Sequence, residues 1–181
     1  MAHEPADGVP AWARRVAYAV PVVVLPSGIW RLGVLFADQK RGGILPDWVM
    51  DGYVIFLTLV SETLAFLAIG LIAHWGEVFP RWLPRLRGRR VPVAAAVVPG
   101  LAGAMILTAV FTVVGIAGEI MQTKLNGDPL PADYPSKAGG WHTAYFYVSY
   151  APLVLWGPML AVLTVAYWHR RTNRQPDPAS S

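Results

Sequence analysis

The stretch VPVAAAVVPGLAGAMILTAVFTVVGIAG, residues 91–118, runs for 28 residues without a charged side chain. A helix rises about 1.5 Å per residue, so this stretch exceeds the roughly 20 residues that cross a bilayer core about 30 Å thick. Residues 93–98 are continuously apolar, whereas a strand of a membrane barrel would alternate apolar and polar residues. The stretch therefore predicts a transmembrane helix.

The same helix carries small residues at intervals of four. Gly100, Ala104, Thr108 and Thr112 follow one another at this spacing. Small side chains at such intervals let helix backbones approach closely. We expect this face to pack against another helix rather than to line a pore.

Three further blocks have the same apolar character. Over the whole chain of 181 residues, 55% are hydrophobic and 14% are charged, against roughly 25% charged in an average soluble domain. We predict an all-α membrane protein, a bundle of four transmembrane helices that forms a single membrane domain over residues 16–168. The predicted helices cover residues 16–37, 52–73, 91–118 and 143–168.

Basic residues predict how the helices are oriented. The N-terminal segment, the middle loop and the C-terminal tail together hold ten Lys and Arg residues, and the other two loops hold four. Cytoplasmic loops carry the excess of Lys and Arg, so both termini are predicted in the cytoplasm. Residues 1–11 and the tail 169–181 are polar and unpatterned, and we expect them to be disordered.

A cleaved signal peptide is the alternative interpretation of the first block. Residues 16–37 follow a pair of arginines, as the apolar core of a signal peptide would. The block is too long, however, and it contains Pro21, Pro26 and Arg31. We therefore interpret it as a retained helix.

Arg31 and Glu62 are the main candidates for function, because each places a charge inside a predicted transmembrane helix. Such a charge costs at least about 2.5 to 3.5 kcal/mol on insertion scales, so it needs compensation. The two helices are consecutive and antiparallel, which favours contact between them. The sequence predicts a direct ion pair, which would act either as a structural element or as a relay or binding site for a cation. Ser27 and Ser61 are neighbouring candidate ligands.

Two classes of function stay open. The first is a small transporter-like protein or an accessory component that forms oligomers or joins a partner subunit. The second is a membrane-embedded enzyme that acts on a lipid or isoprenoid, with Glu62 as proton donor. A cavity beside Glu62 with Asp38, Asp51 or Glu119 close by would favour an enzyme or a transporter, whereas contact with Arg31 in a filled bundle would favour a structural protein or a subunit. The chain has no cysteine, dinucleotide fingerprint or phosphate loop, and we expect no cofactor.

The loop HWGEVFPRWLPRLRGRRVP, residues 74–92, combines aromatic residues with arginines. We predict that it lies on the cytoplasmic membrane surface, where each arginine contributes about 1 kcal/mol near anionic lipid. Arginines needed for topology explain the net charge of +4, so we expect no nucleic-acid partner. The predicted lipid contacts are Arg81, Arg85, Arg87, Arg89 and Arg90.

Two other features are of interest outside the apolar blocks. His74, Glu77 and His169 are predicted on the same inner face, and three such ligands are a candidate metal site. Histidines are ordinary at a membrane interface, so we expect no metal there. The loop 119–142 contains three prolines, and we expect it to be extracellular and partly ordered over the end of the bundle.

The string GEVFPRWLPRLRGRRVP between two helices and the preceding LPSGIWRL resemble a group of uncharacterised multi-spanning membrane proteins of high-GC actinobacteria. The resemblance extends from the first predicted helix to the last. It implies a multi-pass protein of a bacterial plasma membrane, and it implies no particular activity.

Overall fold

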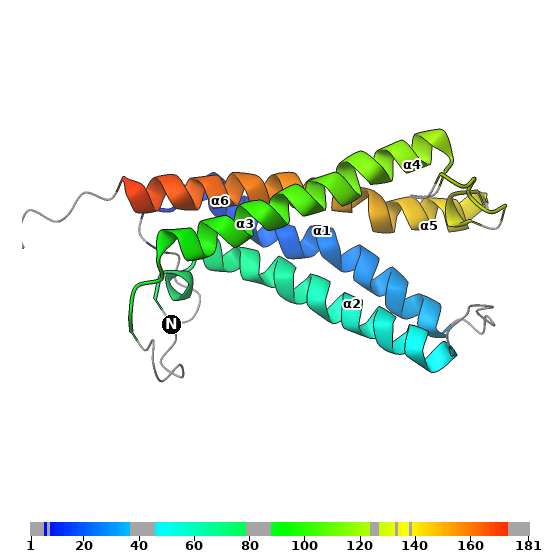
Figure 1. Cartoon of the computed structure of the whole chain (residues 1–181), viewed down its shortest axis with the longest axis horizontal. Coiled ribbons are helices and arrows are strands. Elements are labelled where there is room, and N and C mark those ends of the chain that lie inside the picture. Colours follow the sequence, from blue (N-terminus) through cyan, green and yellow to red (C-terminus); the bar gives the residue numbers. More distant parts are fainter. Residues whose placement is uncertain are drawn as a thin grey trace, which may run out of the picture.

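The computed structural model describes residues 6, 8–36, 46–78, 88–123, 127–132, 134–137 and 139–173. All regular secondary structure in these ranges is helical, as Figure 1 shows. Within them, four helical stretches are long and apolar enough to cross a membrane. They are Ala11–Phe36, Asp47–Leu71, Val93–Met121 and Gly140–Thr172. The predicted helical class and the four long apolar helices are confirmed.

Three of the four stretches change helix type along their length. The first is α1 (Ala11–Phe36), and the second is α2 (Asp47–Leu67) with a 3₁₀ turn at its end. The third consists of α3 (Val93–Leu107), a π-helix (Thr108–Val114) and α4 (Gly115–Met121). The fourth consists of α5 (Gly140–Tyr150), a 3₁₀ segment (Ala151–Leu155) and α6 (Trp156–Thr172). Pro46 and Pro92 precede α2 and α3, where a missing N–H removes no helical hydrogen bond.

The expectation of disorder at both ends is wrong for the residues described there. The N–H of Ala6, a buried residue, donates to the carbonyl of Ile72 at 2.9 Å. α1 begins at Ala11 rather than at residue 16, and α6 continues to Thr172. These segments are ordered because they pack on the ends of the other helices, which a polar composition does not reveal. Residues 1–5 and 174–181 lie outside the described ranges.

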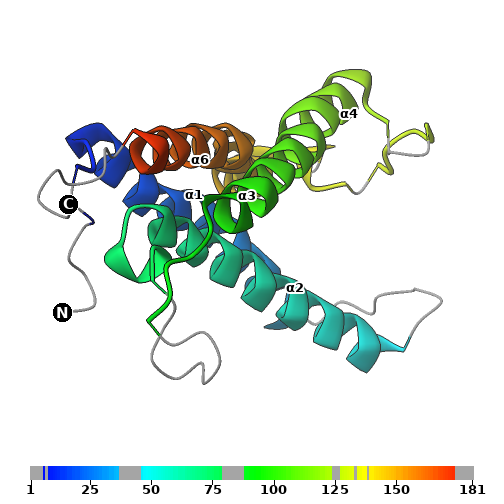
Figure 2. The same cartoon turned by 60° about the vertical axis from the view of Figure 1, so that its left-hand side comes forward.

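α1 lies at the centre of the arrangement. It packs against α2 on one side and against α5 and α6 on the other, while α3 packs mainly on α6. Figures 1 and 2 show α2 diverging from α4 and α5 toward its N-terminal end. The buried face of α1 carries small and medium residues at alternating intervals of four and three, which place them on one side of a helix. These residues are Ala13, Ala17, Val20, Val24 and Ser27.

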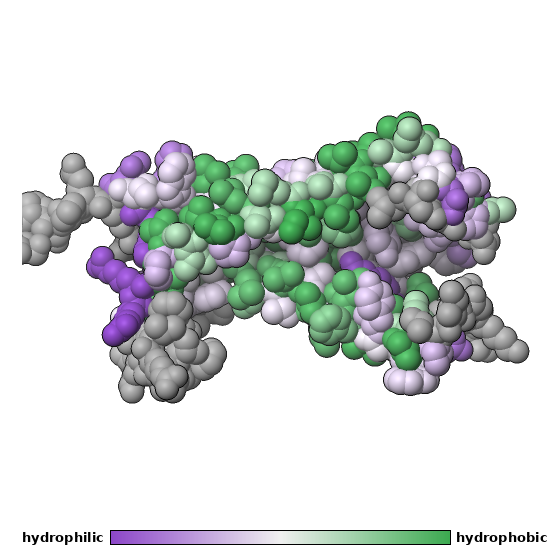
Figure 3. Space-filling model, viewed as in Figure 1, coloured by the Kyte–Doolittle hydropathy of each residue, from purple (hydrophilic) through white to green (hydrophobic). Residues whose placement is uncertain are grey.

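The predicted packing face of the third helix is confirmed at two positions. A Cβ added to Gly100 would lie 2.7 Å from the Thr164 hydroxyl oxygen on α6, so only glycine permits this approach. Ala104, one turn further along, is buried. The rest of this helix is largely exposed, as Met105 and Ile106 illustrate. Figure 3 shows hydrophobic residues along the middle of the helices and hydrophilic residues toward both ends.

A hydrogen bond joins the two irregular segments. Pro158 has no N–H to offer to the carbonyl of Val154, four residues earlier. The Thr112 hydroxyl, from the π-helix, donates to this carbonyl at 2.9 Å. The π-helix and the 3₁₀ segment are therefore in contact where a proline leaves a backbone acceptor open.

Replacing Thr112 with valine should destabilise the protein by about 1 kcal/mol, because the Val154 carbonyl would lose its side-chain donor. Thermal unfolding in detergent measures the effect, and Thr112→Ser should restore most of the loss. Thr63→Val is the control, since the Thr63 hydroxyl is exposed and bonds only within its own helix. Equal stability of Thr112→Val and the unchanged protein would show that this contact is not stabilising.

Candidate functional site

The polar site between α1 and α2 is built around the Arg31 side chain. Arg31 follows Ser27 by one helical turn and continues the buried face of α1. Its guanidinium donates through Nη2 to the Ser27 hydroxyl at 2.9 Å and through Nη1 to the Ser61 hydroxyl on α2 at 3.0 Å. Both serines are buried. The charge is therefore held by hydroxyl groups of two helices.

Glu62 lies next to this group without sharing its hydrogen bonds. The carboxylate atom Oε1 is buried and has no hydrogen-bond partner. It lies against α1 at Gly28, where an added Cβ would be 2.8 Å from Oε1 and 3.4 Å from the Thr58 methyl. Glycine at position 28 thus makes room for the carboxylate.

The predicted direct ion pair between Arg31 and Glu62 is not formed. The guanidinium hydrogen bonds go to Ser27 and Ser61 instead. The physical reason is the helical direction of the side chain, which points back toward the N-terminus and so meets Ser27 first. Thr58, Ser61 and Ala65 form the buried face of α2.

The other candidate acids are not gathered with Glu62. Asp51 precedes it by eleven residues on α2, which corresponds to about 16 Å along the helix. The Oε1 atom of Glu119 accepts a hydrogen bond from the Tyr147 hydroxyl at 2.8 Å, and this places Glu119 against α5. Asp38 lies outside the described residues. The described acids therefore do not form a cluster around Glu62.

The described parts of the loop 119–142 make specific contacts. The N–H of Leu130, a buried residue, donates to the carbonyl of Gln122 at 2.8 Å. The Lys137 ammonium donates to the Leu130 carbonyl at 2.9 Å. Burial raises the pKa of the Tyr134 phenol, and the Glu119 carboxylate raises it further. These contacts and those of residues 135–137 with α5 place the described part of the loop against the ends of α4 and α5.

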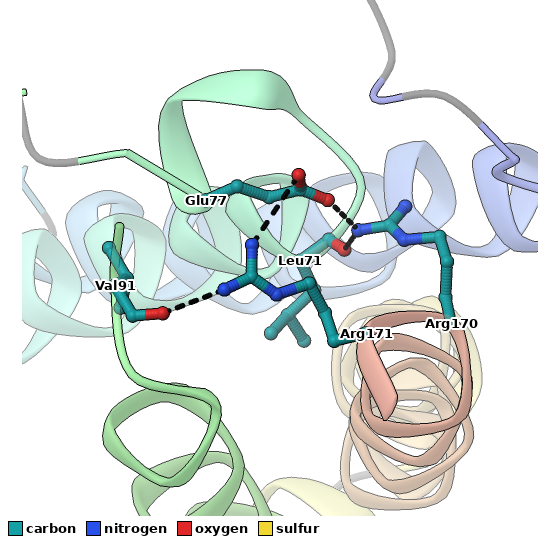
Figure 4. A network of polar contacts seen from close by, with 5 residues as sticks. All are labelled: Leu71, Glu77, Val91, Arg170 and Arg171. Carbon is teal, nitrogen blue, oxygen red and sulfur yellow. Dashed lines mark hydrogen bonds and ion pairs between the residues drawn. The ribbon is translucent and has the colours of Figure 1, made fainter. Parts of the chain in front are cut away.

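A second charged group lies at the opposite end of the helices, around Glu77 (Figure 4). Its carboxylate contacts Arg170 at 2.8 Å and Arg171 at 3.5 Å, and all three side chains are at most 11% exposed. Arg170 also donates to the Leu71 carbonyl, and Arg171 to the Val91 carbonyl. Glu77 thereby ties the end of α6 to both ends of the loop 74–92.

The sequence pattern explained Arg170 and Arg171 by membrane topology and did not identify Glu77 as their partner. One sequence feature could have indicated these ion pairs, because Glu77 is the one acid in residues 74–92. Its partners lie 93 and 94 residues away in the chain, a separation that no helical periodicity spans. In the weak candidate metal site at His74, Glu77 and His169, two arginines contact the Glu77 carboxylate. No group of three metal-ligating side chains occurs among the described residues.

The predicted lipid-contacting arginines are described only in part. Arg89 and Arg90 are exposed at the end of the loop, just before α3. Arg81, Arg85 and Arg87 lie outside the described ranges. Contact of these five residues with lipid stays a prediction.

Replacing Glu77 with glutamine should destabilise the protein by about 3 to 5 kcal/mol, because two nearly buried arginines would lose their counter-charge. Thermal unfolding in detergent measures the loss. The exposed residue Arg89 provides the control, and Arg89→Gln should leave stability within about 0.5 kcal/mol. A Glu77→Gln protein as stable as this control would contradict the role of Glu77 as a clamp.

Comparison of the chain with protein-family models, with curated proteins and with solved structures finds no match. The function must therefore be inferred from the geometry of the chain.

Proposed function

We propose that the chain is a multi-pass protein of a bacterial plasma membrane, with four transmembrane helices and both termini in the cytoplasm. The exposed apolar side chains along the four long helices support this proposal, because water would solvate them poorly. The distribution of Lys and Arg supports the orientation. Anionic lipids on the cytoplasmic side would then face the exposed Arg89 and Arg90.

Within this setting, the α1–α2 site fits a small transporter-like or accessory membrane component in which Glu62 takes up and releases a proton or another cation. The observation that carries this proposal is the buried Oε1 atom of Glu62, which has no hydrogen-bond partner. An unpaired carboxylate in an apolar region is costly, so binding a cation there is favourable. Arg31 does not neutralise it by contact, because the serines hold the guanidinium.

The proposed component acts as an oligomer or with a partner subunit. Four helices enclose little space by themselves, and α2 diverges from α4 and α5 (Figures 1 and 2). A pathway that passes Glu62 would need walls from another copy or another chain. The small-residue face of the third helix is used by α6 at Gly100, so such a partner would meet other surfaces.

The enzyme hypothesis receives less support from the same residues. Proton-transfer chemistry on a lipid with Glu62 as donor would be helped by a second acid nearby. Asp51 is far along α2, and Glu119 is held by Tyr147. Neither of these two described acids supplies that group.

Dicyclohexylcarbodiimide tests the role of Glu62, because it reacts with protonated carboxyl groups in apolar surroundings. We expect one adduct per chain, found at Glu62 by peptide mass spectrometry and formed faster at acidic than at alkaline pH. Glu62→Gln should abolish it, and the matched variant Glu119→Gln should keep it. An adduct that persists in Glu62→Gln would contradict the proposal.

Reporter fusions test the orientation. A reporter fused after Ser181 should be active only if it is a type that works in the cytoplasm, because ten of the fourteen loop and terminal Lys and Arg residues lie on that side of the predicted topology. A fusion within the loop 119–142 should show the opposite result. Activity of the external reporter at the C-terminus would overturn the orientation.

A further inference from the structure

The surroundings of Glu62 decide which kind of cation its carboxylate can bind. The Oε1 atom is buried and has no hydrogen-bond partner. On the side of α1 it faces Gly28, where an added Cβ would lie 2.8 Å from Oε1. The space between this oxygen and the backbone of α1 is therefore too small for a methyl group. This contact leaves no room for a metal ion with its ligands on the α1 side of Oε1.

The hydroxyl groups nearest to Glu62 on α2 have other partners. The Thr58 hydroxyl donates to a carbonyl of its own helix at 2.8 Å, and the Thr58 methyl is the group that faces Gly28. The Ser61 hydroxyl also donates to a carbonyl of its own helix at 2.8 Å, and it accepts from Arg31. Cations such as Mg²⁺ and Ca²⁺ take about six or more oxygen ligands. These two hydroxyl groups therefore do not supply a coordination shell for Oε1.

The backbone of α1 does not supply one either. α1 is continuous helix over Ala11–Phe36, so the carbonyls near Gly28 accept hydrogen bonds within the helix. Pro26 leaves one carbonyl open, that of Val22, four residues earlier. Val22 precedes Gly28 by six residues, which corresponds to about 9 Å along the axis, whereas a metal ion lies about 2.0 to 2.6 Å from its oxygen ligands. The open carbonyl is thus out of reach of a metal ion at Glu62.

The charges around Glu62 also disfavour a metal ion. α2 packs mainly on α1 and on the 3₁₀ turn Ala68–Leu71, which carries no titratable side chain. α1 brings Arg31, whose guanidinium donates to Ser61, the residue before Glu62. The nearest other acid on α2, Asp51, precedes Glu62 by eleven residues. A metal ion would therefore be repelled by the guanidinium with no second carboxylate beside it to offset the repulsion.

The geometry points to a proton, and not a metal ion, as the cation that Glu62 takes up and releases. This inference rests on the proposed uptake of a cation at Glu62 and specifies which cation it is. A proton binds covalently to a single carboxylate oxygen and needs no further ligand. The neutral carboxyl group that results removes an unpaired charge from apolar surroundings.

Competition between metal ions and dicyclohexylcarbodiimide tests the proposal. The carbodiimide reacts with the protonated carboxyl group, so a metal ion bound to the carboxylate would slow the reaction. The full chain in mild detergent is labelled over a range of pH in sodium, potassium, magnesium or calcium chloride. Choline chloride of the same ionic strength is the control. We expect the same rate of adduct formation at Glu62 in all of these salts at each pH.

The outcomes of this competition separate the two proposals about Glu62. A slower reaction in one metal salt than in choline chloride, reversed at lower pH, would overturn the proton as the cation and leave cation uptake at Glu62 standing. Absence of the adduct at Glu62 in every salt would overturn the proposed uptake itself, and this inference with it.

Two glycines of α1 provide matched variants that test the close contact. Gly28→Ala places a methyl group 2.8 Å from Oε1, whereas Gly33→Ala places one where no other group lies within 4 Å. Gly28→Ala should displace the carboxylate from its apolar surroundings and lose most of the adduct, and Gly33→Ala should be labelled like the unchanged chain. If Gly28→Ala elutes as aggregate in gel filtration, the salt competition on the unchanged chain decides alone. Equal labelling of a folded Gly28→Ala protein and of Gly33→Ala would overturn the proposal.

Discussion

The narrow buried face of α1 is the constraint on which the other helices depend. Ala13 and Ala17 are small enough for neighbouring helices to approach closely, and Val20 and Val24 continue the same line. α2, α5 and α6 all pack on this helix. Further along, Trp30 contacts Tyr145 at a ring distance of 4.8 Å and extends the packing to α5. A large side chain in place of Ala13 or Ala17 would push α1 away from the helices that pack on it.

The same face carries the main polar site, because Ser27 and Arg31 extend it at intervals of three and four residues. The site therefore owes its position to the periodicity of α1 and its shape to Gly28. Close packing at Gly28 brings Glu62 against a backbone that offers no donor. The Arg31 guanidinium donates instead to the hydroxyls of Ser27 and Ser61. The Arg31 guanidinium is therefore hydrogen-bonded to two serine hydroxyls, whereas the neighbouring Oε1 atom of Glu62 has no hydrogen-bond partner.

Two further contacts, one at a backbone irregularity and one between charged side chains, also hold the helices together. Pro158 leaves an open carbonyl, and Thr112 from the π-helix supplies the donor. Near the end of α6, Glu77 compensates two arginines and ties them to the loop that starts at His74. Nearly all of these contacts join segments that are distant in the chain. They explain why helices with few polar residues adopt one arrangement.

The sequence by itself determined the number of long apolar helices, through the length of the apolar stretches, and the packing face at Gly100, through small residues at helical spacing. Charge inside an apolar block also singled out Arg31 and Glu62. Only the tertiary structure decided how these two charges are solvated, since the choice between an ion pair and the hydroxyls of Ser27 and Ser61 depends on side-chain direction and helix distance. The clamp at Glu77 was likewise decided by tertiary structure, because its arginines are more than ninety residues away and no local pattern relates them. The physical reason is common to both cases: a periodic pattern places a residue on a face, whereas the partner across that face is set by how the helices pack.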